Sequence, residues 1–454
     1  MKSNIITIFL FLNAAMIFLG FGSFMLISLQ EGEKRAAKVS AICACGGIVL
    51  FCLTVFLPLS FQVWFAALVL AVLLIILFLF WLPFAKADMS KDIPRHRVDE
   101  REIMFARARL APESPQHLAY YEMHPEDKVG DDLTRSKPGL LSPHSTYANP
   151  LLFASPSSSF FLTEALSGAT EGPVSTHQYE VEPDRMTPFI KSLARYYGAL
   201  EVGITELQAY HIYSHIGRGS GEYGAPVELH HHSAIAFTVE MDFDMISAAP
   251  RAQAVVESAH QYVEAARVAV QLAATLRNLG HSARAHIDGN YRIICPLVAR
   301  DAGLGEIGRM GILMTPHLGP RVRLAVVTTD LELITDKRRP DPTIIDFCTI
   351  CKKCAHNCPV KAIPFGDRQE IDGALRWKIN SDICFRYWNV VGTDCGRCMS
   401  VCPYSHPDSF FHNMARFGNK YSGGFRRLSL RMDDLFYGKS PDQSHPPSWT
   451  NLIQ

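Results

Sequence analysis

Two cysteine-rich stretches decide the fold of this chain: Cys348–Pro359 reads CTICKKCAHNCP, and Cys395–Pro403 reads CGRCMSVCP. The first stretch has the spacing Cys-x2-Cys-x2-Cys-x3-Cys-Pro. The second has Cys-x2-Cys-x3-Cys-Pro and is preceded by a further cysteine at Cys384. A disulfide-stapled secreted domain would be short and rich in loops, whereas this chain has 454 residues. We therefore interpret these thiols as metal ligands in a reducing compartment.

The repeated Cys-x3-Cys-Pro ending is typical of ferredoxins with two [4Fe–4S] clusters, and tetrahedral zinc sites do not need it. In the bacterial arrangement the fourth cysteine of each run binds the other cluster. One cluster is therefore expected on Cys348, Cys351, Cys354 and Cys402. The second cluster is expected on Cys384, Cys395, Cys398 and Cys358. A chain with two such clusters moves electrons.

The first 87 residues contain three apolar stretches, Ile5–Leu29, Val39–Leu59 and Val63–Ala85. Each is close to the ~20 residues that a helix needs to cross a bilayer. None contains an acidic, basic or histidine residue, so haem ligation by two histidines within them is excluded. We expect a three-helix transmembrane anchor over residues 1–87.

The flanks of these stretches set the expected orientation. Basic residues follow the first stretch (Lys34, Arg35 and Lys38) and the third (Lys86, Lys91, Arg95, Arg97 and Arg101), whereas the second connector is uncharged. The positive-inside rule places both basic flanks in the cytoplasm. We therefore expect a multi-pass protein of the inner (cell) membrane with its catalytic domain on the cytoplasmic side.

The remaining sequence divides by composition and periodicity. Residues 88–180 are rich in proline and serine and are expected to form a linker. Residues 181–345 alternate strand and helix patterns and predict a layered α/β (α+β) catalytic domain. The expected strands are Glu201–Ile204, Ser233–Val239, 283–288 and Arg323–Thr328, and the expected helices are Thr187–Tyr197 and Ala252–Leu279. A ferredoxin-type domain over 346–410 and a C-terminal tail over 411–454 complete the chain.

A glycine-rich segment, DAGLGEIGRMG, occupies residues 301–311. Its first three glycines satisfy G-x-G-x-x-G, but Gly311 and Pro316 follow too soon for the long helix of a dinucleotide site, so we exclude NAD binding. The glycines let backbone approach a flat cofactor closely, or they form a tight turn beneath the clusters. The candidate cofactor-binding residues are Gly303, Gly305, Gly308 and Gly311.

In combination these motifs resemble the reductive dehalogenase family over roughly residues 180–410. The glycine segment, the stretch GPRVRL from Gly319 and both cysteine runs carry the resemblance. It implies a cobalamin-binding reductase core in which a base-off cobalamin is held without an Asp-x-His-x-x-Gly motif. The related epoxyqueuosine reductases share the Gly-Leu-Gly loop, but they typically have Trp and Lys where this chain has Glu306 and Arg309.

The resemblance also implies catalytic residues, because the family uses a tyrosine as proton donor beside a basic residue. Tyr262 stands before an alanine-rich helical pattern that ends at a Leu-Gly pair, as the family's tyrosine does. Arg309 and Arg321 are the candidate basic partners. The alternatives are a core tyrosine on a helix and arginines that contact an anionic part of the cofactor.

The sequence and the resemblance together predict a membrane-bound reductive dehalogenase. Its expected partners are a small organohalide, the membrane, and an unknown electron donor that is a ferredoxin, a flavodoxin or quinol-linked. The 44 basic and 44 acidic residues balance, so no nucleic acid is expected. Two alternatives stay open: an epoxyqueuosine-reductase-like enzyme that contains cobalamin and iron–sulfur clusters, and a non-catalytic membrane iron–sulfur electron carrier.

Overall fold

The computed structural model describes residues 2–81, 87–441 and 446–451. They divide into two compact units. One unit comprises Met1–Ala87 and Pro407–His445, and the other comprises Asp88–His406 and Pro446–Gln454.

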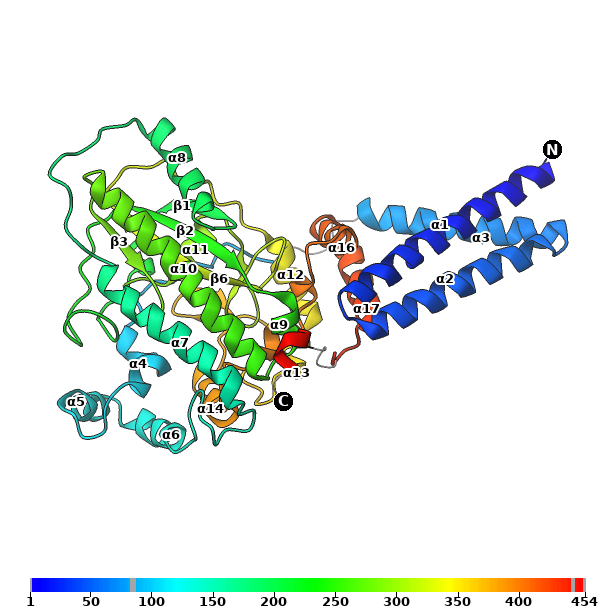
Figure 1. Cartoon of the computed structure of the whole chain (residues 1–454). Helices are drawn as coiled ribbons and strands as arrows, with labels where there is room; N and C mark the ends of the chain where they lie inside the picture. The colour runs from blue at the N-terminus through cyan, green and yellow to red at the C-terminus, as the bar shows by residue number, and fades with distance from the viewer. Residues whose placement is uncertain (1, 82–86, 442–445, 452–454) are drawn as a thin grey trace. The chain divides into compact units, whose positions relative to one another are not determined.

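The first unit is a bundle of apolar helices. Its three long helices are α1 (Lys2–Gln30), α2 (Lys34–Val55) and α3 (Leu59–Trp81), drawn in blue in Figure 1. All three are long and apolar enough to cross a membrane, so the three expected apolar stretches do form long helices. The end of the third expected span, residues 82–85, lies outside the described residues.

The same unit contains two helices from the other end of the chain, α16 (Phe410–Tyr421) and α17 (Gly423–Phe436). They contact the long helices through aromatic pairs such as Phe24–Phe411 and Phe24–Phe436. The structure therefore differs from the expected C-terminal tail over 411–454. The polar and apolar residues of α16 alternate with a helical period, which the sequence analysis left unused.

The second unit is built on an antiparallel sheet of four strands in the order β1 (Val202–Glu206), β2 (Ser233–Glu240), β6 (Val322–Thr329) and β3 (Ala283–His286). Ile235 at the centre of β2 pairs with Ile204 on one side and Val327 on the other. The strands lie where the sequence predicted them. Because every pairing is antiparallel, the domain is of the α+β type within the expected mixed class.

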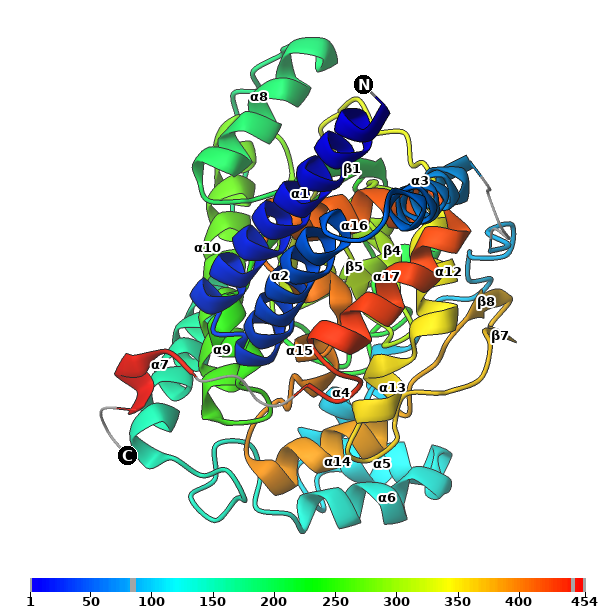
Figure 2. The same ribbon diagram turned by 90° about the vertical axis from the view of Figure 1, so that its right-hand side faces the viewer.

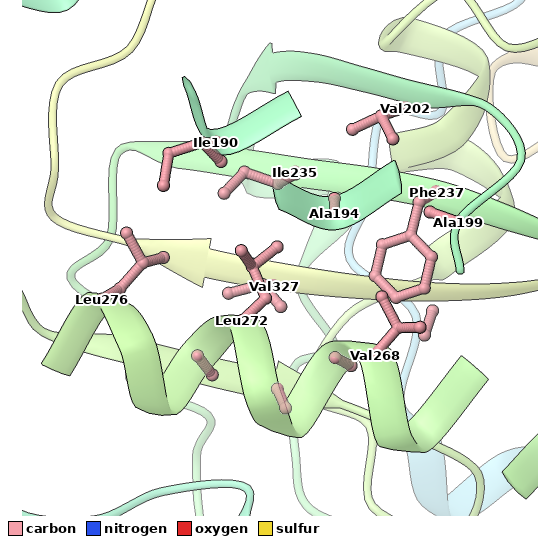
Figure 3. Packing of buried hydrophobic residues seen from close by; sticks show 14 of the residues in the cluster. Ile190, Ala194, Ala199, Val202, Ile235, Phe237, Val268, Leu272, Leu276 and Val327 are labelled. Atoms are coloured by element: carbon pink, nitrogen blue, oxygen red, sulfur yellow. The ribbon is translucent and has the colours of Figure 1, made fainter. Parts of the chain in front are cut away.

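Helices cover both faces of this sheet. Helix α10 (Ala252–Asn278) and helix α8 (Pro183–Tyr196) pack on one face, where Leu272 and Leu276 meet Ile235 and Val327 (Figure 3). Helix α11 (Cys295–Asp301) packs on the other face. Successive residues of a strand point to opposite faces of the sheet. Ile235 therefore packs in the core on the α10 face, and the next residue, Ala236, packs in the core on the α11 face.

The segment 88–180, expected to be a linker, folds with this unit. It contains η1 (Glu100–Glu102), α4 (Met104–Ala108), α5 (Pro115–Met123), α6 (Pro125–Arg135), α7 (Pro150–Leu166) and η2 (Ser167–Ala169). Its richness in proline and serine was the reason to expect a linker. Pro115, Pro125 and Pro150 instead occupy the first positions of their helices. An N–H group at that position has no hydrogen-bond partner within the helix, so proline, which has no N–H, is tolerated there. Helix α7 packs on α10 through Phe153.

The cysteine runs belong to a segment of short elements that follows the sheet along the chain and is labelled in Figure 2. These elements are α12 (Pro342–Cys351), α13 (Lys353–Asn357), β7 (Gln369–Ile371), β8 (Ala374–Arg376), α14 (Ser381–Val391), α15 (Arg397–Ser400) and η4 (Pro403–Ser405). The remaining short elements are η3 (Ala209–His211), α9 (Phe243–Ser247), β4 (Glu306–Ile307), β5 (Leu313–Met314) and η5 (Ser448–Asn451).

We expect Leu272→Ala to destabilise the sheet unit by about 2–5 kcal/mol, because the substitution leaves a cavity under a fully buried side chain. Leu118→Ala on α5 is the control, since Leu118 is 60% exposed. Thermal unfolding of the purified full-length protein, followed by circular dichroism, measures both variants. Equal melting temperatures for the two variants would contradict the assigned core.

Candidate active site

A cavity of about 470 Å³ lies in the sheet unit and is bordered by both the sheet and the cysteine runs. Strand β6 contributes Arg323 and its neighbours, α10 contributes Tyr262, and α14 contributes Trp388. Helix α4 adds Phe105 from the segment expected to be a linker. Most of the lining side chains are apolar or aromatic, so the cavity suits a largely apolar occupant.

Cys384 and the seven cysteines of the two runs lie near one another, and the expected crossed ligand sets group them in fours. Burial raises the pKa of Cys402, and the nearby sulfurs of Cys351 and Cys348 raise it further. Burial also raises the pKa of Cys384 to about 11, with Cys358 adding to the rise. The last cysteine of each run is therefore close to cysteines of the other run.

These sulfurs are not arranged around a single ion. Among the described residues, no three Cys, His, Asp or Glu side chains converge on one point as the ligands of one metal ion do. The corners of a four-iron cubane hold four thiolates farther apart than that. Four thiols in each set match the donor number of such a cluster.

One of the two sets borders the cavity. Its members are Cys358, Cys384, Cys395 and Cys398, and all four are lining residues. Of the other set, Cys351 is partly exposed, whereas the remaining three cysteines are buried. Cys384 and Cys398 of the cavity-lining set are likewise partly exposed.

Tyr262 and Arg323 form a pair on the cavity wall. The guanidinium carbon of Arg323 lies 4.5 Å from the centre of the Tyr262 ring. Asp394 pairs with Arg323 at 3.2 Å, and Ser258 contacts the same guanidinium group. Burial raises the pKa of Tyr262 to about 12, and the positive charge of Arg323 opposes that rise. The Tyr262 phenol therefore keeps its proton at neutral pH and has a cation beside its ring.

The arginines that the sequence proposed as partners of Tyr262 have other contacts. Arg309 donates to the carbonyl oxygens of Cys348 at 3.0 Å and of Pro364 and Gly366 at 2.7 Å each, and it lies 4.5 Å from the ring centre of Trp377. Arg309 therefore fastens the first cysteine run.

Arg321 has a similar structural task. It donates to the carbonyl oxygen of Ser405 at 2.9 Å and pairs with Glu240 at 2.8 Å. The arginine over the tyrosine is Arg323, two residues farther along, and the sequence analysis missed it. The signal was available, because Arg323 belongs to the same GPRVRL stretch and begins the apolar run of β6.

None of the four glycines of residues 301–311 lines the cavity, and Gly305 and Gly308 instead shape a hairpin. A Cβ atom on Gly308 would lie 2.6 Å from Met314 Cγ and 3.5 Å from Cys348 Sγ. A Cβ atom on Gly305 would lie 2.2 Å from the Met314 carbonyl oxygen. The cavity is bordered by Met310, Ile312 and Leu313 of this segment. The glycines thus allow β4 and β5 to close tightly beside the first cysteine run.

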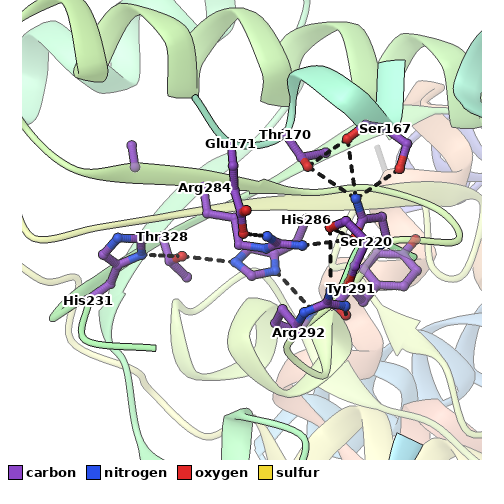
Figure 4. Close-up of polar contacts among 12 residues, drawn as sticks. Ser167, Thr170, Glu171, Ser220, His231, Arg284, His286, Tyr291, Arg292 and Thr328 are labelled. Atoms are coloured by element: carbon purple, nitrogen blue, oxygen red, sulfur yellow. Dashed lines mark hydrogen bonds and ion pairs between the residues drawn. The ribbon is translucent and has the colours of Figure 1, made fainter. Parts of the chain in front are cut away.

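A buried polar network supports the loop that carries Tyr291 into the cavity wall (Figure 4). The Asn290 amide donates to Ser167 Oγ at 2.8 Å and to Thr170 Oγ1 at 3.1 Å. Arg284 donates to Asn290 Oδ1 at 2.8 Å. Because Thr170, Arg284 and Asn290 are buried and Ser167 is partly buried, the network fixes the loop and with it the position of the Tyr291 ring.

Comparison with known proteins agrees with this geometry. A family model described as a 4Fe-4S dicluster domain matches residues 347–406. The chain is 35% identical over 195 residues to a tetrachloroethene reductive dehalogenase of Desulfitobacterium hafniense, covering 40% of this chain and 35% of that protein. It is 29% identical over 292 residues to the tetrachloroethene reductive dehalogenase of Sulfurospirillum multivorans, covering 57% and 58%. The chain is related to the reductive dehalogenases.

Solved structures extend the resemblance to the fold. A catabolic reductive dehalogenase, NpRdhA, superposes with a TM-score of 0.63 at 25% identity over 78% of this chain and 49% of that chain. Two more reductive dehalogenase structures, at 24% identity and the same TM-score, include a complex with 3-bromo-4-hydroxybenzoic acid and one described as B12-dependent. These matches confirm the expected fold class, with a dicluster module following the sheet core.

The similarity covers only part of the length of these relatives. The chain spans 35% of the length of the first relative and about half of the solved NpRdhA chain. An epoxyqueuosine reductase of Lactococcus garvieae is 29% identical over 122 residues, covering 25% of this chain and 33% of that enzyme. The relation to epoxyqueuosine reductases is therefore confined to a shorter segment.

We expect Arg309→Leu to lower the iron content of the purified protein. The substitution leaves buried carbonyl oxygens without their donor, and each costs about 1–3 kcal/mol, so the first cysteine run loses its fixed position. Iron per chain and the electron paramagnetic resonance spectrum measure the effect. Arg368→Leu is the matched control, because Arg368 lies near the same Trp377 ring but hydrogen-bonds to Asp88. Iron content equal to that of the control would refute this role.

Proposed function

We propose that the sheet unit is a cobalamin-dependent reductive dehalogenase that reduces a small organohalide with electrons from two [4Fe–4S] clusters. The observation that carries the proposal is the composition of one cavity wall. Cysteines of one set and the Tyr262–Arg323 pair border the same space. Electrons and a proton can therefore be delivered to one bound substrate.

The crossed cysteine sets are the proposed cluster ligands. Cys348, Cys351, Cys354 and Cys402 hold the cluster that receives electrons, and the partly exposed Cys351 marks its entry. Cys358, Cys384, Cys395 and Cys398 hold the cluster beside the cavity. The electron donor is a ferredoxin, a flavodoxin or a quinol-linked carrier that docks near Cys351.

The residues around the cavity suit a base-off cobalamin. No histidine occurs among the described residues that line it, so the protein offers no imidazole ligand to the lower face of a corrinoid. The bound cofactor would supply the two electrons that break the carbon–halogen bond. The aromatic rings of Phe105 and Trp388 lie on the same wall and suit an apolar organohalide.

In the overall reaction, two electrons and one proton replace a carbon–halogen bond by a carbon–hydrogen bond and release a halide ion. Tyr262 donates the proton from its hydroxyl group to the carbon that has lost the halide. Arg323 stabilises the phenolate that remains, and Asp394 and Ser258 hold the guanidinium group over the ring. Asp394 and Ser258 are positioning residues in this scheme.

The proposed location is the inner membrane, with the sheet unit on the cytoplasmic side. The membrane location is supported by three helices that are long and apolar enough to span a bilayer. The side follows from the basic residues Lys34, Arg35 and Lys38 after α1 and from Lys91 and Arg95 after α3.

We expect Tyr262→Phe to lower the rate of halide release about 10²–10⁴-fold, the usual contribution of a positioned proton donor. The assay uses the detergent-purified full-length protein, reconstituted with iron, sulfide and cobalamin under a chemical reductant. Tyr196→Phe is the control, because Tyr196 is 85% exposed. Cluster and cobalamin contents should be unchanged in both variants.

Two outcomes of that experiment would overturn the proposed function. Clusters without cobalamin binding would identify a membrane iron–sulfur electron carrier. Cobalamin binding without halide release, together with restored queuosine in a strain that lacks epoxyqueuosine reductase, would identify the tRNA-modifying reaction.

The crossed ligand sets predict a specific pattern among alanine variants. Cys358→Ala should resemble Cys384→Ala and lose the cluster at the cavity, although Cys358 belongs to the first run. Cys402→Ala should resemble Cys348→Ala. Iron per chain should fall by about half in each variant, since one of two clusters is lost, and the spectrum of the remaining cluster identifies it. A Cys358→Ala spectrum that matches Cys348→Ala would show uncrossed sets.

A further inference from the structure

Helix α16 has its polar and apolar faces reversed relative to a helix of a water-soluble protein. Its inner face is polar, and His412, Arg416 and Asn419 are buried. Its outer face is apolar and comprises Phe410, Met414, Phe417 and Tyr421, which are 73%, 51%, 61% and 54% exposed. Their spacing of four, three and four residues places them on one side of the helix. Four large side chains in water on one stripe would be costly.

The inner face of α16 is fixed to the bundle of long helices. His412 Nε2 lies 3.1 Å from Glu31 Oε2, and both side chains are almost fully buried. The ring of Phe411 packs on Phe24 with centroids 5.3 Å apart. Glu31 follows the last residue of α1 directly. Helix α16 therefore lies at the end of the bundle where α1 stops.

Helix α17 is fixed to the same end of the bundle. Phe436 packs on Phe24 with centroids 5.2 Å apart, and Arg35 at the start of α2 donates to the carbonyl oxygen of Leu435 at 3.3 Å. The hydroxyl group of Ser422 donates to the carbonyl oxygen of Leu79 near the end of α3. The ends of α1 and α3 and the start of α2 lie on one side of a three-span bundle. Both C-terminal helices are thus held where the spans leave the bilayer.

We infer that α16 and α17 lie in the plane of the membrane, with the stripe Phe410–Tyr421 inserted at the boundary between headgroups and acyl chains of an anionic leaflet. Leu26 and Leu29, near the end of α1, are exposed as well. Aromatic residues favour this depth. Lys420, Arg427 and Arg431 are exposed on the two helices and would attract anionic headgroups.

The inference changes the extent of the membrane unit. The segment Asp88–His406 is joined to membrane-bound chain at both ends, through Ala87 and through Pro407. A chain tethered at two points has fewer orientations relative to the bilayer than one held by a single flexible linker. The inference rests on the three apolar helices and does not depend on the proposed reaction.

The test places a photo-crosslinking residue on the stripe. Phe417→p-benzoylphenylalanine in the full-length protein is irradiated in vesicles of phosphatidylglycerol and phosphatidylcholine that carry a fluorescent lipid. The same residue at Tyr196 is the control. The expected yield of lipid adduct at position 417 is about tenfold above that at position 196, because only an inserted side chain meets acyl chains. Phe410→p-benzoylphenylalanine repeats the test if the first variant does not fold.

The crosslinked products show whether lipid, a second copy of the chain, residues 88–406 or water covers the apolar face of α16. A crosslink from position 417 to a second copy of the chain would identify a dimer interface and overturn the inference. A crosslink to a peptide from residues 88–406 would show that the catalytic unit covers the stripe, with the same consequence. An equal, low lipid yield at positions 417 and 196 would show that the stripe faces water. Halide release need not be measured, so failure here leaves the proposed dehalogenation untouched.

Discussion

Arg309, in the hairpin between β4 and β5, and Arg321, directly before β6, hold the cysteine runs in place, and the rest of the candidate site depends on this attachment. Both guanidinium groups are almost fully buried, and each donates to carbonyl oxygens of the cysteine segment. That segment consists of short helices and loops, and its carbonyl groups would otherwise be buried without donors. A guanidinium group can serve several carbonyls at once because its donors form a rigid fork, and a lysine could not replace it.

The attachment also fixes the position of the cavity wall. Arg321 directly precedes β6, and Arg323 is the second residue of that strand. The stretch that donates to Ser405 of the cysteine segment therefore also carries the guanidinium group above the Tyr262 ring. Asp394 strengthens this coupling. It pairs with Arg323 and directly precedes Cys395, which borders the cavity. The tyrosine pair and the proposed cavity-side cluster are therefore positioned by the same two segments, and a shift of one would move the other.

The elements with a strong period were predictable from sequence. The four strands and α10 were found because buried strands and an amphipathic helix leave clear apolar patterns, and the three apolar helices were found by length. The helices of residues 88–180 were not predictable, because Pro115, Pro125 and Pro150 are ambiguous in sequence. A proline can begin one helix and break another. The identity of the arginine beside Tyr262 was not predictable either. Three arginines flank the glycine hairpin or β6, and only tertiary packing decides which one reaches the ring.

The chemistry of Tyr262 follows from opposing effects on one hydroxyl group. Burial raises its pKa to about 12, so the phenol keeps its proton throughout the neutral range. The ordinary pKa of a tyrosine phenol is 10.0, so in the unfolded chain this phenol loses its proton at a lower pH than in the folded protein. Folding therefore disfavours the phenolate, and the raised pKa lowers the stability of the fold only as the pH rises above about 10. Arg323 acts in the opposite direction and lowers the free energy of the phenolate without removing the proton. In the proposed reaction, the pair would release its proton to the carbanion-like carbon that forms when two electrons expel the halide ion, and Arg323 would stabilise the phenolate that remains.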